Sequence, residues 1–404
     1  MDSEIKKRIA QIRRGEVPEG YKKTKYGILP ADWTVYILGD CLSRIEKPVK
    51  VNPNEWYTQI GIRSHGKGLF YKEPVTGAEL GNKAVYWVQP NCFVLNIVFA
   101  WEQAIGKTSQ AEAGMIGSHR FPMYRPINDK IDIDYLIAYL LTKRGTDILE
   151  MSSPGGAGRN RTLGQEHFLK SKVVFPSVAE QKKIAAILTT QDKVIELKEK
   201  RLAEKQRQKM YLMQQLLTGK KRLPGFTFEV EKTNIKTIST YSVSTISQTT
   251  LDSYEGKRLY PVFNANSIGG YVDFYQNKCP YVSIIKDGAG IGRVRLCEAK
   301  SSTIGTMGCI HARKGISIIF LYYLLEQVDF GKYSNGSTIP HLYYKDYSCE
   351  KVRVPDLQEQ TAIAQVLSTA DREISLLRQD IEKEKQKKKA LMQLLLTGIV
   401  RVNV

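Results

Sequence analysis

The chain has 404 residues, and a composition of 42% hydrophobic and 9% aromatic residues excludes a disordered chain. Its longest apolar runs, 92–100 and 316–325, are far shorter than the roughly 20 residues of a membrane span. The first fourteen residues are charged throughout, so no signal peptide is expected. These features predict a soluble, cytoplasmic protein with two or three domains and no membrane partner.

The net charge of +19 is distributed along the whole chain. Five consecutive parts, 1–25, 26–176, 177–222, 223–355 and 356–404, each contain more lysine and arginine than aspartate and glutamate. A basic tail or a membrane-binding helix would concentrate the charge in one part. The even distribution favours a long polyanion, and nucleic acid in particular, over one small acidic ligand.

The cysteines and histidines indicate no metal site. Six cysteines stand far apart without a CxxC pair, and the five histidines complete no metal-ligand spacing. We therefore expect buried free thiols rather than a zinc site or a disulfide framework.

A helical lead-in over 1–23 precedes a first domain that we place at 24–172. Residues 85–88 and 93–99 are β-type runs, and 135–141 is a short apolar helical stretch. Glycine, asparagine and proline punctuate these runs. The pattern predicts a mixed α/β domain with an irregular sheet.

Loops of this domain combine glycine with long basic or amide side chains. Arginine and lysine can pair with guanine edges, asparagine can pair with adenine edges, and glycine lets the backbone approach a phosphate. Taken alone, such loops are ordinary surface turns more often than they are contacts. The candidate DNA-binding residues are Arg63, His65, Lys67, Lys107, Arg159, Asn160 and Arg161.

Residues 173–222 contain a long predicted helix. Ser177, with Glu180 three positions on, has the pattern of a capping box, in which the cap side chain accepts from the N3 amide and the N3 carboxylate reaches back to the cap amide. Apolar residues then recur every seven positions, as in a coiled-coil seam, and Gly219 follows the expected helix end. The apolar seam residues are Ile184, Leu188, Ile195, Leu202, Leu212 and Leu216.

A second domain, which we place at 223–351, has the same character. Residues 281–285 form a β-type run and 318–325 an apolar helical stretch. Faint matches to the first domain, such as 304–306 with 116–118, predict the same fold with different loops. The candidate DNA-binding residues are Asn264, Asn266, Ser267, Lys286, Arg293, Asn335, Ser337 and Thr338.

Residues 352–401 repeat 173–222 at a constant offset of 179, and twenty of the fifty positions are identical. Glu180-Gln181 recurs as Glu359-Gln360, and Asp356 takes the cap position of Ser177. We therefore place a second helical region at 352–404. Its apolar seam residues are Ile363, Leu367, Ile374, Leu377, Ile381, Leu391 and Leu395.

Two similar apolar stripes in one chain most simply bury each other. Each helix of about 40 residues would be about 60 Å long. A pseudo-twofold relation would make the helices antiparallel, with the domains at opposite ends, whereas the alternative is that each helix packs on its own domain. Lys198 and Lys205 lie on the first seam and Glu384 on the second, so charge pairing could help to set the register.

No catalytic constellation is found in the sequence. Gly288, Gly290 and Gly292 lack the GxGxxG spacing of a dinucleotide site, and 155–158 lacks the GK[ST] ending of a phosphate loop. A chain that is not itself an enzyme is expected, with no catalytic and no metal-binding residues.

The repeated helix start, P-x-[VL]-x-E-Q-x-x-I-A-x-[IV]-L, and the repeated helix end, L-M-Q-x-L-L-T-G, resemble the specificity subunits of type I restriction-modification systems. In the first copy the helix end continues into 220–226, and residues 20–25 with 29–33 resemble the entry to the first recognition domain of that family. The likeness covers nearly the whole chain.

The resemblance implies an α/β (α+β) fold with two mixed α/β target-recognition domains separated by two long antiparallel coiled-coil helices. It implies a non-catalytic subunit that recognises double-stranded DNA, with one domain for each half of a bipartite target. The helices would set the unread gap and dock two modification subunits, which use S-adenosylmethionine to methylate a flipped adenine. Restriction subunits would use ATP and Mg²⁺ for translocation and cleavage.

Two other functions fit parts of the sequence. A recognition subunit of a restriction system that cuts on both sides of a bipartite site would have the same features. A coiled-coil scaffold whose domains bind proteins would explain the helices, but not the basic and divergent loops.

Overall fold

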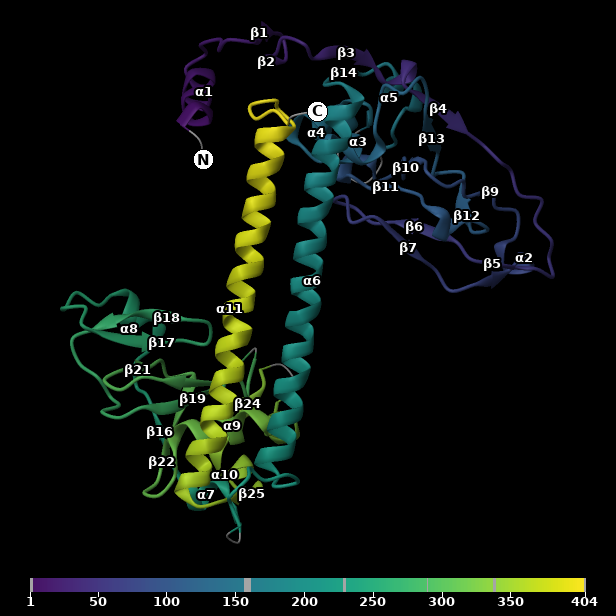
Figure 1. Ribbon diagram of the computed structural model, residues 1–404. Helices are drawn as coiled ribbons and strands as arrows, with labels where there is room; N and C mark the ends of the chain where they lie inside the picture. Colours follow the sequence, from purple (N-terminus) through teal and green to yellow (C-terminus); the bar gives the residue numbers. More distant parts are fainter. Residues whose placement is uncertain (1–2, 156–160, 228–229, 289, 337–338, 403–404) are drawn as a thin grey trace. The chain divides into compact units, whose positions relative to one another are not determined.

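The computed structural model of the protein describes residues 3–155, 161–227, 230–288, 290–336 and 339–402 (Figure 1). The chain forms two compact units, which we call unit 1 (residues 1–197 and 381–404) and unit 2 (residues 198–380). Two long helices, α6 (Val178–Leu217) and α11 (Leu357–Leu395), each contribute one part to each unit.

Unit 1 contains a domain of short strands and helices, which we call domain 1, and the adjoining parts of α6 and α11. The other elements of this unit are α1 (Ser3–Arg13), β1 (Tyr21–Thr24), β2 (Gly27–Pro30), β3 (Thr34–Ile37), η1 (Leu38–Asp40), β4 (Leu42–Ile45), β5 (Trp56–Tyr57), β6 (Ile60–Ile62), β7 (Leu69–Tyr71), β8 (Val75–Thr76), α2 (Gly77–Leu80), β9 (Val85–Trp87), β10 (Phe93–Leu95), η2 (Ala100–Glu102), β11 (Ile105–Lys107), η3 (Gln110–Glu112), β12 (Ile116–Ser118), β13 (Met123–Pro126), α3 (Ile133–Leu140), α4 (Lys143–Met151), α5 (Gln165–Leu169) and β14 (Lys172–Phe175).

The largest sheet of domain 1 has the strand order β11-β10-β13-β4. All three residues of the central strand β10 are buried, as the apolar sequence requires. Helix α3 begins at Asp132, whose side chain accepts from the amide of Tyr135 at 2.9 Å. Strand β14 pairs antiparallel with β3, which joins the end of the domain to its start.

Unit 2 contains a second domain, which we call domain 2, and the remaining parts of α6 and α11. Its other elements are β15 (Glu231–Asn234), α7 (Ile235–Ile238), β16 (Ser239–Val243), α8 (Gln248–Asp252), β17 (Tyr260–Phe263), β18 (Ile268–Val272), β19 (Tyr281–Ile285), β20 (Val294–Cys297), β21 (Ser302–Thr303), β22 (Met307–Ala312), α9 (Ile318–Gln327), η4 (Phe330–Tyr333), β23 (Ser334–Asn335), β24 (His341–Leu342), α10 (Tyr344–Tyr347) and β25 (Lys351–Val354).

Domain 2 repeats the plan of domain 1 with different strand lengths. Its largest sheet has the order β16-β22-β19-β20, and every residue of β19 is buried. Helix α9 is capped by Ser317, and β15 pairs antiparallel with β25 to join the start of the domain to its end. A second sheet, β18-β17-β21, carries the turn 264–267.

Both long helices begin and end where the sequence predicts. Helix α6 starts after Ser177 and α11 after Asp356, and glycines with positive φ follow both ends, Gly219 at +67° and Gly398 at +71°. In each unit, low-numbered residues of one helix face high-numbered residues of the other, so the two helices are antiparallel (Figure 1). The predicted fold class is confirmed.

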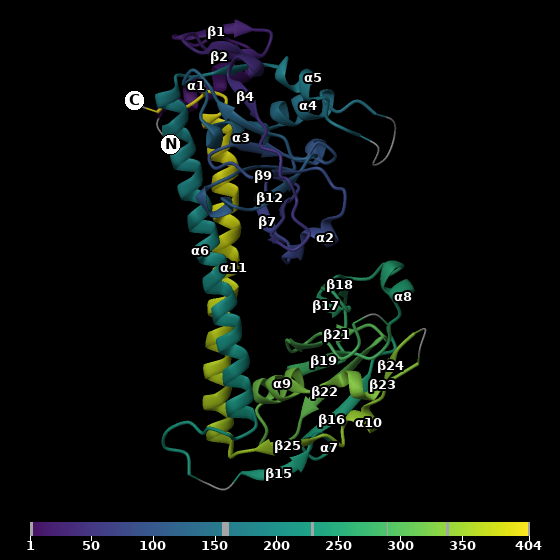
Figure 2. The ribbon, with the colours of Figure 1, turned by 90° about the vertical axis from the view of Figure 1, so that its right-hand side faces the viewer.

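The segment that contains α1 and β1 contacts the turn after α11, all within unit 1 (Figure 2). The guanidinium of Arg8, on α1, donates to the carbonyl of Ile399 at 3.0 Å. The hydroxyl of Tyr21, on β1, donates to the carbonyl of Gly398 at 2.6 Å. The predicted lead-in therefore covers the turn that follows α11.

The expectation of buried thiols is only partly correct. Cys41, Cys92, Cys297 and Cys309 are buried, but Cys279 and Cys349 are exposed, and all six are free. The exposed pair lie outside the helices and strands. No helix in the described part of the chain has the length and apolar character of a membrane span.

Candidate nucleic-acid interface

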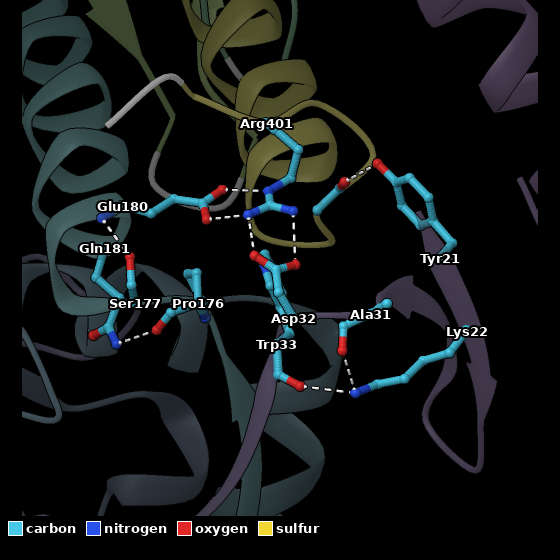
Figure 3. A network of polar contacts seen from close by, with 11 residues as sticks. Tyr21, Lys22, Ala31, Asp32, Trp33, Pro176, Ser177, Glu180, Gln181 and Arg401 are labelled. Carbon is cyan, nitrogen blue, oxygen red and sulfur yellow. Dashed lines mark hydrogen bonds and ion pairs between the residues drawn. The ribbon is translucent and has the colours of Figure 1, made fainter. Parts of the chain in front are cut away.

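The start of each long helix is tied to the end of the other repeat by an arginine–glutamate pair, which we call a clasp. In unit 1, Arg401 donates from Nε and Nη2 to the two carboxylate oxygens of Glu180, both at 2.7 Å (Figure 3). In unit 2, Arg222 donates from Nε to Glu359 at 3.0 Å and from Nη2 to the second oxygen. The offset of 179 relates both residues of one clasp to those of the other.

The predicted capping boxes form only in part. The cap side chains do accept from the N3 amides, Ser177 from Glu180 at 3.3 Å and Asp356 from Glu359 at 2.9 Å. The carboxylates of the two glutamates, however, are directed to the clasp arginines. Both glutamates are buried, at 1% and 2% exposure, where a bidentate arginine compensates their charge better than one amide could.

The glutamine that follows each clasp glutamate fastens the helix to its domain. The amide of Gln181 accepts from Asp132 N at 2.9 Å and donates to the carbonyls of Lys130 and Pro176, both at 3.0 Å. Gln360 repeats this arrangement, accepting from Ser317 N at 2.8 Å and donating to the carbonyls preceding α9 and α11. The repeated Glu-Gln dipeptide therefore has the same structural role in both units.

Ion pairs between α6 and α11 flank the apolar seam. Lys198 pairs with Asp380 at 2.8 Å and Lys205 with Glu373 at 2.7 Å, both in unit 2. The predicted involvement of both lysines in charge pairing is correct. Glu384 accepts a hydrogen bond from Gln191 at 2.7 Å, in unit 1.

The predicted seam residues are buried or half-buried in the structure. In unit 1, Ile184 and Leu188 join the core of domain 1 together with Leu395. In unit 2, Leu216 joins the core of domain 2 together with Ile363 and Leu367. Each core is therefore shared by a domain and the ends of both helices, which combines the two packing arrangements that the sequence left open.

In domain 1, the loop 63–68 lies beside the long helices. Gly66 lines a small recess together with Ala185 of α6 and Lys388 of α11. The exposed Arg63 donates to the carbonyl of Leu69 at 2.6 Å, and the exposed His65 has a left-handed backbone, with φ of 60°.

Two further predicted cations of domain 1 already have partners. Lys107 forms an ion pair with Asp134 of α3 at 2.6 Å. The guanidinium of Arg161 stacks over the ring of Trp101, 5.6 Å from its centroid. Lys67, by contrast, is exposed on its loop.

In domain 2, the turn 264–267 is held by the residues predicted to contact DNA. The side-chain oxygen of Asn264 accepts from the amides of Asn266 at 3.0 Å and Ser267 at 2.9 Å. Arg295 of β20, which the sequence reasoning missed, donates to the carbonyl of Asn266 at 2.7 Å and so ties the turn to the main sheet. The side chains of Asn266 and Ser267 are exposed at the tip.

The structure brings together two other predicted loops of domain 2. Asp287 accepts from Lys286 and, at 2.8 Å, pairs with Nδ1 of His341, next to the hairpin of Asn335. Burial raises the pKa of Asp287, but the bonds from the lysine and the histidine outweigh it, so that the pKa lies below its ordinary value. Arg293, which directly follows Gly292 in the chain, is exposed.

Asn335 is exposed and donates to the carbonyl of Tyr333 at 3.2 Å. Four predicted residues, Arg159, Asn160, Ser337 and Thr338, lie outside the described residues. Within the described ranges, no group of three or more histidine, cysteine, aspartate or glutamate side chains is arranged to hold a metal ion.

A family model described as type I restriction modification DNA specificity domain matches the chain twice, over residues 48–206 and 228–385. A putative type I restriction enzyme MjaX specificity subunit from Methanocaldococcus jannaschii is 24% identical, with 95% of this chain and 97% of that protein aligned. The MjaVIII specificity subunit of the same organism is 22% identical over 95% and 96%.

Solved structures share the fold. The type I restriction-modification system S subunit from M. genitalium superposes with a TM-score of 0.60, at 14% identity, over 90% of this chain and 96% of that one. A chain from a structural study of complex assembly and conformational transition in a type I R-M system superposes with a TM-score of 0.57, at 16% identity, over 92% and 99%.

Proposed function

The chain belongs to the type I restriction-modification DNA specificity family, whose members are non-catalytic specificity subunits, and we propose that each of its two domains reads one half of a bipartite DNA target. In this proposal α6 and α11 set the length of the unread gap between the half-sites. The modification subunits, and the restriction subunits where present, assemble on this chain. They contribute S-adenosylmethionine, ATP and Mg²⁺ chemistry, and this chain contributes the sequence preference.

The single observation that carries the proposal is the internal repeat. The residues that are identical between the two copies hold the helix ends and the domain cores, as Glu180, Gln181 and Ile184 do. We call these helix ends and domain cores the frame. The domain loops, which are not part of the frame, differ between the copies. A protein that presents two different reading surfaces on one repeated frame is what recognition of a split, asymmetric target requires.

The dimensions of the long helices support a bipartite target. Helices α6 and α11 contain 40 and 39 residues, so each is about 60 Å long at 1.5 Å per residue. Half-sites one turn of DNA apart are about 34–36 Å from each other, within the reach of such helices. We propose boundaries for the functional parts at 24–172 and 223–351 for the domains and 173–222 and 352–404 for the helical regions, with 1–23 as a lead-in.

The net charge of +19 supports contacts with several phosphates. Each phosphate contact releases condensed counterions, so the logarithm of the affinity should fall linearly with the logarithm of the salt concentration. We expect the reconstituted complex to lose about a thousandfold or more in affinity between about 50 and 200 mM salt, for six or more contacts. A nearly flat salt dependence would contradict this part of the proposal.

For domain 2, we propose that the turn 264–267 contacts base edges. Because Asn264 holds the turn with its oxygen, the variant Asn264→Asp keeps that acceptor while it removes the amide donor and adds a negative charge. Asn266→Ala removes an exposed side chain without touching the turn bonds. Both variants should relax the sequence read by domain 2 and leave the other half-site intact; an unchanged target for both would exclude these side chains from recognition.

The modification subunits require a surface on the helices that is not already buried. The seam residues cannot supply it, but Leu197 on α6 is 64% exposed and Leu376 on α11 is 58% exposed. The offset of 179 relates these two leucines, so each helix presents the same apolar position. We propose that each leucine contacts one modification subunit, which gives two modification subunits per chain.

The proposed function is tested by mapping methylated adenines across the genome of the source cell, with and without this gene. Loss of one split motif, with two short half-sites around a fixed gap, is the expected result. An unchanged map, combined with no DNA binding by the complex reconstituted from its subunits, would favour the scaffold function instead. Cleavage on both sides of the split motif would indicate the related restriction system.

A further inference from the structure

Domain 1 contains an open cleft of about 810 Å³ that none of the predicted DNA-binding residues lines. One wall is formed by residues 82–86, which lead into β9, and by the turn 118–121 after β12, its partner strand. Figure 2 shows β9 and β12 side by side. Gln59 and Lys72, which flank the hairpin β6–β7, complete the cleft together with Asn96, Val98 and Phe99.

The chemistry of the cleft lining matches that of DNA. Lysine and arginine bind phosphates and guanine edges, asparagine and glutamine bind adenine edges, and aromatic rings contact thymine methyls and sugars. No carboxylate is among the lining residues. The polar lining residues are Lys72, Lys83, His119, Arg120, Gln59, Asn82, Asn96 and Ser118, and the aromatic ones are Tyr86, Phe99 and Phe121.

The cations of the cleft are available to a ligand. Lys72, Lys83 and Arg120 are exposed, and no carboxylate in the described part of the chain forms an ion pair with them. The predicted cations Lys107 and Lys286, in contrast, are paired with aspartates. The cleft therefore offers a concentrated positive surface that the protein does not neutralise internally.

Backbone hydrogen bonds hold the cleft residues in place. Arg120 lies in a turn in which Phe121 N donates to Ser118 O at 2.8 Å and Arg120 N to Ser118 Oγ at 3.2 Å. His119 N donates to the carbonyl of Ala84 at 3.1 Å, which joins this turn to the loop that carries Asn82. Side chains on fixed backbone lose less entropy on binding, as sequence readout requires.

We infer that this cleft is the base-reading site of domain 1, with Arg120 and Asn82 as specificity-determining residues and Lys72 and Lys83 as phosphate contacts. The inference rests on the proposed function and assigns its residues. The occupant is one edge of double-stranded DNA, because cations on several walls suit a ligand whose charge continues beyond the cleft, and the amides suit base edges between those charges.

The test is sequence selection from a random duplex library by the full chain reconstituted with its modification subunits. Arg120→Ala and Asn82→Ala should each reduce the preference at one or two base pairs of one half-site by about tenfold, the scale of one good base contact. The other half-site and the gap should not change. Lys170→Ala is the matched control, since it removes an exposed cation of domain 1 that pairs only along α5 and lies outside the cleft.

The two lysines give an independent readout. Lys72→Ala and Lys83→Ala should weaken binding to all sequences equally and lower the slope of affinity against salt by about one each. Arg120→Gln, which keeps a polar side chain but removes the guanidinium, replaces Arg120→Ala if the alanine variant melts at a lower temperature than the control.

The outcomes separate this inference from the proposed function. A split motif selected by the wild-type chain, and also by the Arg120 and Asn82 variants without change, would overturn the inference and leave the proposed function standing. Uniformly weaker binding in those variants, without loss at particular bases, would also overturn it. Failure of the wild-type complex to select any split motif would overturn the proposed function itself.

Discussion

The ends of the long helices have the same residues in both halves of the chain, whereas the loops of the two domains do not. Identical residues at the helix starts make bonds that recur atom for atom, as Gln181 and Gln360 do with the loops before α3 and α9. The divergent loops lie at exposed turns, such as 118–121 and 264–267. Identity at the helix ends therefore marks the frame, and divergence of the domain loops marks the surfaces that we propose read DNA.

The two clasps differ in their surroundings. Arg401 also donates to both oxygens of Asp32, at 2.8 and 2.7 Å (Figure 3). In the alignment of Pro30 with Pro224, the position of Asp32 is taken by Phe226. The glutamate is thus present in both clasps, while the second acid, Asp32, is in unit 1, between β2 and β3.

The largest effect is expected from removing a clasp arginine. Arg401→Ala leaves the carboxylate of Glu180 buried without its cation, which should destabilise unit 1 by about 3 kcal/mol or more. Arg222→Ala should act in the same direction on unit 2. Urea unfolding followed by circular dichroism measures both, with Lys170→Ala as the control. A loss of stability no larger than that of the control would show that the clasps do not hold the frame together.

The clasp glutamines should have the next largest effect. Gln181→Ala and Gln360→Ala each leave a partly buried backbone amide and two carbonyls without their side-chain partner, at a cost of about 1–3 kcal/mol. The same unfolding measurement applies, and the exposed Gln214→Ala should change stability by less than about 0.5 kcal/mol. Different losses in the two units would show that the frame is not equivalent in them.

The exposed leucines test the partner surface rather than the frame. Leu197→Glu and Leu376→Glu should each weaken binding of one modification subunit by about tenfold, about 1.4 kcal/mol, with no loss of folding stability. Mass measurement of the assembled complex should then show one modification subunit lost per substitution. Gln208→Glu, which adds the same charge on α6, is the control. Full assembly with both variants would show that the modification subunits dock on another surface.

A smaller effect is expected in the seam of unit 2. Lys209→Ala removes ion pairs to Asp371 at 2.8 Å and Glu326 at 3.0 Å, and a cation–π contact with Tyr323. We expect a loss of about 1 kcal/mol that shrinks as salt is added, since the two acidic partners are about a third exposed although Lys209 is mostly buried. A loss that does not respond to salt would assign the role of Lys209 to packing instead.

The smallest effect concerns pH and is confined to unit 1. The bonds from Arg401 hold the pKa of Asp32 below its ordinary value, so its contribution to stability is complete above the unfolded value of about 3.9 and is lost as pH falls through the lower folded value. Asp32→Asn should therefore lower stability at pH 7 and converge with the wild type in acid. Equal differences at pH 7 and in acid would exclude this ionisation.

The sequence was sufficient to predict the long helices, because heptad spacing, caps and terminal glycines are local signals. Helix α3, helix α9 and strand β19 were also predicted from apolar runs. The clasps were missed, since nothing local connects Glu180 with Arg401, 221 residues away. The repeat contains a signal that could have identified the clasps. Arg222 and Arg401 are identical at the end of the two copies, and Glu180 and Glu359 are identical near their start.

Prediction of the candidate DNA-binding residues was limited by a different cause. In a sequence, glycine-rich loops with polar side chains suggest contacts with DNA. In the structure, however, the side chain of Asn264 holds its own turn and Lys107 forms an ion pair with Asp134. The cleft of domain 1 is assembled from several short segments between Gln59 and Phe121. None of these segments is distinctive alone, so only the folded chain shows that their cations and amides converge.

The most direct test of the central claim, one domain for each half-site, is selection of bound sequences from a random duplex library by the reconstituted complex. It compares the wild-type chain with Asn266→Ala in domain 2. The account predicts two short selected blocks separated by a gap of fixed length for the wild type, and loss of preference in one block only for the variant. A single continuous block, or equal loss in both blocks, would contradict it.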